Sequence, residues 1–170
     1  MRIQIIGFSG SGKSTLAKSL AEYFKLNLLH LDTVQFHGNW EVRDYQEQVE
    51  IVRDFLSNNE EWVIDGNYSK IVNERFSLSD MTIYLKFNRF ACYYRCLKRF
   101  LKNRNKTRDC LGCKEKFDLE FQKWILFNGR TKAIKQRHDQ NLSLCQGRKI
   151  VLKNQRQVRK FMKEVVKGEI

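Results

Sequence analysis

The sequence predicts an α/β fold built on a parallel sheet, and three observations support this. Short apolar runs alternate with longer segments in which apolar residues recur every three or four positions, the pattern of buried strands joined by helices. The first run leads into a glycine-rich loop, Gly7–Thr15, that matches the phosphate-binding pattern G-x-x-x-x-G-K-[ST]. Two later runs are followed by or end in a carboxylate, at Asp32 and Asp65. In parallel sheets, ligands bind at the carboxyl ends of the strands, where these two residues are expected.

The first half of the chain is expected to hold three strands and two helices. Three apolar runs that are too short for helices are predicted to be buried strands: 2–6, 27–31 and 62–64. The helix predicted over 13–24 carries Leu16, Leu20 and Phe24 on one face. A second helix is predicted over 41–57, and its apolar face is defined by the following residues: Val42, Tyr45, Val49, Val52, Phe55 and Leu56.

The second half repeats the alternation around one irregular segment. Strands are predicted over 81–87 and 149–152, and a helix over 89–102. Residues 103–115 are polar and basic and show no periodicity. A long helix is expected to resume near residue 116, with these residues on one face: Phe117, Phe121, Trp124 and Ile125. A last helix is marked by Val158, Phe161, Met162 and Val165.

The glycine-rich loop carries the clearest chemistry. Its glycines allow positive φ and a close approach of backbone to ligand, so that successive N–H groups converge on a phosphate at the start of the following helix. Lys13 can bridge terminal phosphates, and the Ser14 hydroxyl can hold Mg²⁺. A plain Gly/Ser turn is the alternative. We expect ATP and Mg²⁺ as cofactors, bound by Gly7, Ser9, Gly10, Ser11, Gly12, Lys13, Ser14 and Thr15.

Two carboxylates are candidates for metal and acceptor chemistry. Asp65 follows Val63-Ile64, and an acid at that point of a strand can support the Mg²⁺ shell together with Ser14. Asp32 follows the second strand and can orient or deprotonate an acceptor hydroxyl. The alternatives are an N-cap or turn role for Asp32 and a simple Asp-Gly turn at Asp65.

Arginines, aromatics and cysteines supply further candidates. Arg95 and Arg99 are four residues apart on one helix face and can stabilise the charge of a transferring phosphoryl group; solvated surface arginines are the alternative. Phe36 and Trp40 follow the second strand, where they could line an acceptor pocket or pack in the core. The spacing of Cys110 and Cys113 suits zinc, but a closed site needs four ligands, and no second close pair is present. The role of Cys110 and Cys113 stays open.

The charge and composition narrow the classes of partner. The net charge of +13 peaks in residues 86–137, with 16 Lys/Arg against 4 Asp/Glu, whereas residues 1–85 hold 8 against 12. The basic segment 86–137 suits either a nucleic-acid surface or a cluster that surrounds phosphates. No apolar run is long enough to span a membrane. An odd number of cysteines, five in all, favours reduced thiols and a cytoplasmic protein.

Several motifs together resemble a known family. Besides the phosphate loop, the chain contains His30-Leu31-Asp32 with Trp40 close behind, Trp62-Val63-Ile64-Asp65-Gly66-Asn67-Tyr68-Ser69, Ile83-Tyr84-Leu85, the Arg95/Arg99 pair, Glu115-Lys116-Phe117-Asp118 and Phe121-Gln122-Lys123-Trp124-Ile125. This set resembles the bacterial DNA topology modulation protein group, small adenylate-kinase-like P-loop proteins. The resemblance covers nearly the whole chain.

The resemblance implies a P-loop NTPase of the nucleoside-monophosphate-kinase-like type. Its parallel sheet would have five strands in the order 2-3-1-4-5, with helices on both faces. One domain, 1–170, would carry a substrate arm over about 33–60 and a lid over about 103–115. The arm lacks the arginine pair of adenylate kinases, which weighs against AMP as acceptor.

Two functions follow from these residues. The first is a small kinase whose acceptor contacts Asp32, Phe36, Trp40, Asp65, Asn67 and Tyr68 and whose catalytic groups are Lys13, Asp32, Arg95 and Arg99. The alternative is a nucleic-acid-associated P-loop ATPase that influences DNA topology. The identity of the acceptor, the preference for ATP or GTP and the oligomeric state stay open.

Overall fold

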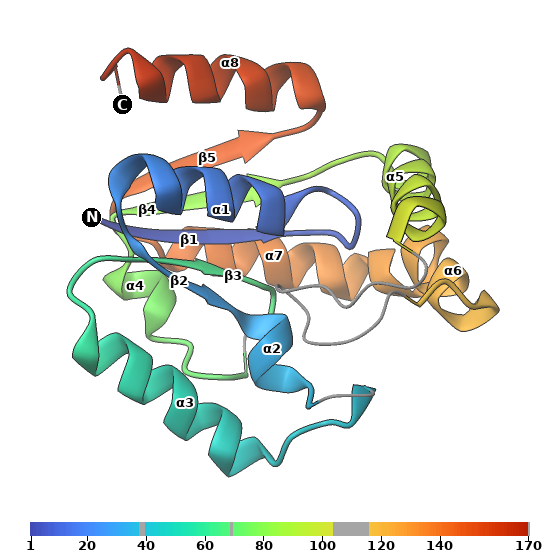
Figure 1. Cartoon of the computed structure of the whole chain (residues 1–170), viewed down its shortest axis with the longest axis horizontal. Helices are drawn as coiled ribbons and strands as arrows, with labels where there is room; N and C mark the ends of the chain where they lie inside the picture. Colours follow the sequence, from blue (N-terminus) through green and yellow to red (C-terminus); the bar gives the residue numbers. More distant parts are fainter. Residues whose placement is uncertain (38–39, 69, 104–115, 170) are drawn as a thin grey trace.

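Five parallel strands form one sheet in the order β2-β3-β1-β4-β5, as predicted. The computed structural model describes residues 1–37, 40–68, 70–103 and 116–169. The central strands are buried on both faces, which explains why their sequences are mostly apolar and do not alternate between apolar and exposed polar residues. The strands are β1 (Arg2–Gly7), β2 (Asn27–His30), β3 (Trp62–Asp65), β4 (Met81–Leu85) and β5 (Arg148–Leu152) (Figure 1).

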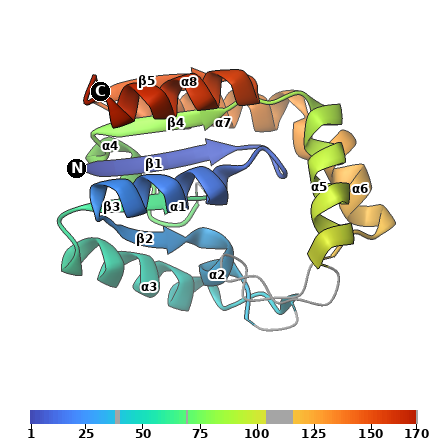
Figure 2. The ribbon, with the colours of Figure 1, turned by 45° about the horizontal axis from the view of Figure 1, so that its top comes forward.

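The helices cover both faces of the sheet and one of its ends. Figure 2 shows α1 and α8 in front of the sheet and α4 and α7 behind it, while α5 and α6 lie beyond the carboxyl ends of the strands. The helices are α1 (Lys13–Phe24), α2 (Leu31–Gln35), α3 (Tyr45–Asn58), α4 (Arg75–Leu78), α5 (Arg89–Asn103), α6 (Leu119–Leu126), α7 (Lys132–Leu144) and α8 (Gln155–Val166), with a 3-10 turn η2 (Asn128–Arg130). Within the described ranges, no helix is both long and apolar enough to cross a membrane.

The second strand is shorter than predicted, and this moves Asp32. β2 ends at His30, and Asp32 lies in the first turn of α2, not at the end of a strand. The Thr33 hydroxyl donates to the His30 carbonyl over 2.7 Å, and the Phe36 N–H donates to the Asp32 carbonyl over 3.1 Å. These bonds close a short helix where the apolar run suggested continued strand. Asp32 nevertheless stays at the end of the sheet where the phosphate loop lies.

The expected long helix from residue 116 is divided into two. α6 begins after Asp118, whose carboxylate caps the Phe121 N–H over 2.8 Å, and α7 begins after Thr131, which caps Ile134. At Gly129 between them, a side chain would lie 2.8 Å from the Trp124 carbonyl, so the chain turns tightly there. The predicted lid, 103–115, lies outside the described residues except for Asn103, which ends α5; Cys110 and Cys113 lie outside them as well.

The predicted helix over 41–57 also begins later than expected. α3 begins at Tyr45, after Asp44 accepts the Gln46 N–H at 2.8 Å. Val42 instead pairs with Phe36 in an antiparallel bridge, so the residues before α3 form part of a small hairpin. The helix itself packs Val49 and Val52 in one cluster with residues of β3.

An aromatic cluster behind the phosphate loop predicts a pH dependence of stability. His138 of α7 is buried against Phe8 and Tyr84, with ring centroids 5.1 and 5.2 Å away. Burial, and next the charge of Lys13, lowers the pKa of His138 from 6.5 to about 4. The neutral imidazole is therefore the form that fits the fold.

Acid is expected to destabilise the fold through this histidine. Because the pKa of His138 is lower in the folded state, its contribution is complete above pH 6.5 and is lost as the pH falls toward 4, by about 3 kcal/mol. Urea unfolding at pH 7 and pH 4.5 measures this, with His138→Gln as the variant that cannot titrate. The variant should lose about 2 kcal/mol less than the wild type over this pH interval. An identical loss in both proteins would contradict the assignment.

Candidate active site

The phosphate loop connects β1 to α1 and has the geometry that an anion requires. Gly10 (φ 77°) packs so closely on α5 that a Cβ would lie 2.6 Å from both the Cys92 carbonyl and the Cys96 sulfur. Gly12 (φ 97°) is the N-cap of α1, and no side chain caps the helix there. The first N–H groups of α1 are thus left for a ligand at the positive end of the helix dipole.

Polar side chains of the loop lie around this helix terminus. The Lys13 ammonium donates to the Gly7 carbonyl over 3.0 Å and reaches the Phe8 carbonyl at 3.4 Å, so it lies across the loop. Ser11 is 2% exposed, and its hydroxyl has no hydrogen-bond partner in the described part of the chain. Ser9 is half-buried and Thr15 exposed. An orphaned hydroxyl and an uncapped helix start fit a phosphate group here.

Asp65 joins the phosphate loop to β2. Its carboxylate is 4% exposed; one oxygen accepts the Ser14 hydroxyl over 2.9 Å, and the other is bonded to Nδ1 of His30. A serine hydroxyl and a carboxylate are oxygen ligands of the kind Mg²⁺ prefers, so these residues fit the predicted metal site. His30 was not among the predicted site residues. The register of β2 and β3 would have revealed it, because His30 and Asp65 are directly paired across these two strands.

Asn67 is tied to the phosphate loop itself. Its side-chain carbonyl accepts the Gly7 N–H over 2.9 Å, and its amide donates to the Gly7 carbonyl over 2.7 Å. This paired bond fixes the first residue of the loop. The amide predicted to contact the acceptor is therefore engaged with backbone in this structure.

Tyr68 and Asp32 form a second polar pair. The Tyr68 hydroxyl donates to Asp32 over 2.7 Å. Burial, and next the charge of Asp32, raises the pKa of Tyr68, so the phenol stays protonated and remains a donor. Asp32 is half-buried and keeps its second oxygen for other partners.

A buried arginine supports the loop that carries this tyrosine. Arg75 is fully buried and donates to the carbonyls of Tyr68, Ile71 and Val72 and to the side-chain carbonyl of Gln4. Burial lowers the pKa of Arg75 to about 9. Its guanidinium is consumed in shaping the chain after β3, and sequence patterns gave no sign of it because its partners are backbone carbonyls.

The predicted substrate arm contains a small hairpin with two aromatic rings. His37 and Arg43 donate their N–H groups to the carbonyls of Glu41 and Gln35 over 2.8 and 2.9 Å. The rings of Phe36 and Trp40 lie 5.3 Å apart, edge to face. The backbone of Trp40 has φ 67°, a left-handed conformation that is unfavourable for a bulky residue.

Arg95 lies against the phosphate loop. Its guanidinium donates to the Ser11 carbonyl over 2.9 Å, contacts Gln155 at the start of α8 and stacks on Phe87 at 4.9 Å. Arg99 is one turn further along α5, with a guanidinium nitrogen 3.9 Å from the Cys96 sulfur. Both are half-buried, and they share one helix face.

Arg130 is a second arginine whose role the sequence did not reveal. It is buried at η2 and donates to the carbonyls of Ile125 and Phe87 over 2.9 and 2.8 Å. Its guanidinium lies 4.0 Å above the Phe8 ring. One side chain thus connects α6, the end of β4 and the phosphate loop.

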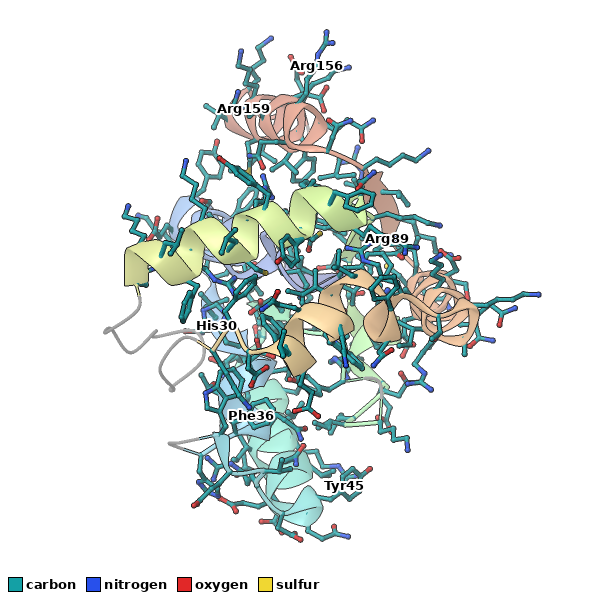
Figure 3. All side chains as sticks on the ribbon, turned by 90° about the vertical axis from the view of Figure 1, so that its right-hand side faces the viewer. His30, Phe36, Tyr45, Arg89, Arg156 and Arg159 are labelled. Atoms are coloured by element: carbon teal, nitrogen blue, oxygen red, sulfur yellow. The ribbon has the colours of Figure 1, made fainter. Side chains whose placement is uncertain are left out.

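Figure 3 views this end of the molecule directly. His30 and Phe36 lie in the lower half of the view, below α5, whereas Arg156 and Arg159 of α8 lie at the top and Arg89 lies to the right. Phe36 of the predicted arm and these three arginines therefore lie in different parts of this end of the molecule.

Comparisons with known proteins bear on the fold. No protein-family model and no curated protein sequence matches the chain. A solved shikimate kinase from Acinetobacter baumannii, in complex with shikimate, aligns with a TM-score of 0.61 and 15% identity over 99% of this chain and 93% of that one. A shikimate kinase from Bacteroides thetaiotaomicron gives 0.54 and 18%, over 98% of each chain.

A third similar structure is a nucleoside kinase. Deoxyadenosine kinase from M. mycoides, with dCMP and dCDP bound, gives a TM-score of 0.51 at 14% identity, over 98% of this chain and 100% of that one. The fold is thus that of P-loop kinases of the nucleoside-monophosphate-kinase type, as predicted. At these identities the likeness concerns the fold alone, and membership of the DNA topology modulation group stays a prediction.

Proposed function

We propose that the chain is a phosphotransferase that moves the γ-phosphoryl group of ATP to a hydroxyl group of a small acceptor. The observation that carries the proposal is the convergence, at one end of the sheet, of an uncapped α1 terminus, the Ser14–Asp65 pair and Arg95. Phosphoryl transfer is catalysed mainly by positioning and by charge stabilisation, and these groups supply both.

The nucleotide would be held by the loop and its flanking charges. Backbone N–H groups of residues 10–15 bind the phosphates, and Lys13 reaches the terminal ones. Ser14 and Asp65 would hold Mg²⁺, which would supply positive charge to the phosphates when bound. Arg95 and Arg99 then stabilise the transferring group from the α5 side.

The acceptor would lie on the opposite side of the γ-phosphate, beside Asp32 and Tyr68. Asp32 orients the acceptor hydroxyl, and Tyr68 holds the carboxylate in place by donating to one oxygen. As the acceptor oxygen bonds to phosphorus, the bond from phosphorus to the β,γ-bridging oxygen breaks. ADP leaves with that oxygen, and the hydroxyl proton passes to Asp32.

Substitution of the two carboxylates is expected to have different effects. Asp65→Asn should weaken Mg²⁺-dependent ATP binding by about 10- to 100-fold, because the metal loses a charged ligand. Asp32→Asn should leave ATP affinity within about twofold and lower turnover by about 10²-fold or more. Calorimetry with and without Mg²⁺, together with acceptor-dependent ADP release, separates these effects. The opposite pattern would mean that the two roles are exchanged.

A second candidate is favoured by one surface. α5 contains no acidic residue, and Phe90 and Tyr94 on its outer side are 70% and 64% exposed. Aromatic rings beside Lys and Arg are a usual platform for single-stranded nucleic acid. In this alternative, the basic segment 86–137 binds a polynucleotide and the nucleotide site drives or regulates that binding. We favour the kinase, because Arg95 of the same segment points to the phosphate loop.

A further inference from the structure

The two sides of the candidate site differ sharply in charge. Residues 31–47, which follow β2 and reach the first turn of α3 on the acceptor side, hold four Asp/Glu and one arginine. α5, which closes the phosphate side, holds five Lys/Arg and no Asp/Glu: Arg89, Arg95, Lys98, Arg99 and Lys102. In Figure 3, Phe36 of the predicted arm lies below α5, and Arg89 of α5 lies to the right of it. Phosphates therefore meet positive charge on one side, and the acceptor meets negative charge on the other.

The cations in and beside residues 31–74 are bonded to neighbouring groups or exposed to solvent. Arg43 donates to the Val34 carbonyl over 3.0 Å and forms an ion pair with Glu47. Arg53 and Lys70 are exposed to solvent. Arg75, directly after residue 74, is fully buried on backbone carbonyls. In the described residues 31–74, the arm therefore offers no buried arginine fork of the kind that binds a phosphate or carboxylate.

The acids, in contrast, are near the expected point of reaction. Asp65 accepts a hydrogen bond from Ser14, which belongs to the phosphate loop. Asp32 accepts one from Tyr68, which lies in the chain that follows β3. Asp65 would be neutralised by Mg²⁺, but an anionic group placed about 5 Å from the Asp32 carboxylate would bind about 10²-fold more weakly than an uncharged group. The geometry thus selects against anions on this side.

The aromatic hairpin indicates a ring in the acceptor. Phe36 and Trp40 lie edge to face, and Trp40 has a left-handed backbone between the hairpin bonds from His37 to Glu41 and from Arg43 to Gln35. A strained backbone that the surrounding structure maintains is a feature of ligand sites. Two tilted rings present flat apolar surface that suits another flat ring.

We infer that the acceptor is an uncharged, hydroxyl-bearing ring compound of the nucleoside class, and not a nucleoside monophosphate or a carboxylate. This inference rests on the proposed phosphotransferase, because it assigns the ring to the Phe36–Trp40 hairpin and the hydroxyl to Asp32. The transferred phosphoryl group then meets the cations of α5, and only the uncharged part of the acceptor meets the acids.

Matched pairs of acceptors that differ in one anionic group test the inference. The probes are adenosine with AMP, cytidine with CMP and thymidine with dTMP, each with the wild-type protein and a non-hydrolysable ATP analogue plus Mg²⁺. Calorimetry gives the affinity of each member. In the pair that binds best, the nucleoside should bind about 10²-fold more tightly than its monophosphate.

Variants show whether charge is the cause. Asp32→Asn should reduce the preference for the uncharged member about tenfold, whereas Glu50→Gln, at an exposed position on α3, should leave it unchanged. An equal or tighter affinity for the monophosphate in the wild type would overturn the inference, and so would the absence of binding by all three nucleosides.

The same experiment distinguishes this inference from the proposed function. ADP release with ATP is measured for each pair alongside binding. A nucleoside that binds but receives no phosphoryl group would support the acceptor class and contradict the phosphotransferase. Efficient transfer to a monophosphate would support the phosphotransferase and contradict the acceptor class.

Discussion

Replacement of Lys13 by alanine is expected to weaken ATP binding by about 10²-fold without unfolding the protein. The ammonium lies across the phosphate loop, 3.0 Å from the Gly7 carbonyl, and a charge-assisted hydrogen bond to a phosphate contributes about 1.5–3 kcal/mol. Calorimetric titration with ATP·Mg²⁺ measures the loss. Lys18→Ala, at an exposed position of the same helix, is the matched control and should bind ATP as the wild type does. Equal affinity in all three proteins would remove the basis of nucleotide binding at this loop.

Simultaneous replacement of Arg95 and Arg99 by alanine is expected to lower acceptor-dependent turnover by about 10³-fold or more. Arginines that stabilise a transferring phosphoryl group contribute effects of this size, and Arg95 already contacts the loop through the Ser11 carbonyl. ADP release is measured with small acceptors, with and without DNA. Lys98→Ala, an exposed cation on the same helix, controls for lost charge and should retain turnover.

Comparing turnover with and without DNA discriminates between the two candidate functions. The kinase requires turnover that depends on the acceptor, collapses in the double variant and ignores DNA. Turnover that occurs only with DNA and survives the loss of both arginines would favour the nucleic-acid-associated ATPase. Binding of DNA alone does not discriminate, because clustered Lys and Arg attract any phosphate chain.

The sheet could be predicted from the sequence because its strands are locally encoded. β1, β3 and β4 are buried on both faces, so each appears as a short, mostly apolar run without the three- and four-residue spacing of a surface helix. The failures occur where tertiary contacts decide. The turn at Gly129 depends on the Trp124 side chain and carbonyl, and the end of β2 depends on hydrogen bonds that redirect the chain into α2.

The candidate site likewise has a part that the sequence predicts and a part that depends on tertiary contacts. The phosphate loop is a continuous motif, and its residues lie where the pattern placed them. The partners of those residues are distant in sequence: Asn67 bonds to Gly7, His30 to Asp65 and Tyr68 to Asp32. Only the order of the strands brings them together, and a list of conspicuous residues cannot say which pairs will meet. Their functional roles stay predictions until the variants are measured.

The contact between Arg130 and Phe8 changes how the loop motif itself should be understood. Phe8 occupies a position that the pattern G-x-x-x-x-G-K-[ST] leaves free. Here its buried ring is held by the Arg130 guanidinium on one side and by His138 and Tyr84 on others. The position that the motif leaves open is therefore constrained in this protein, because a side chain of another size at residue 8 would disturb the packing of α7, β4 and η2 together.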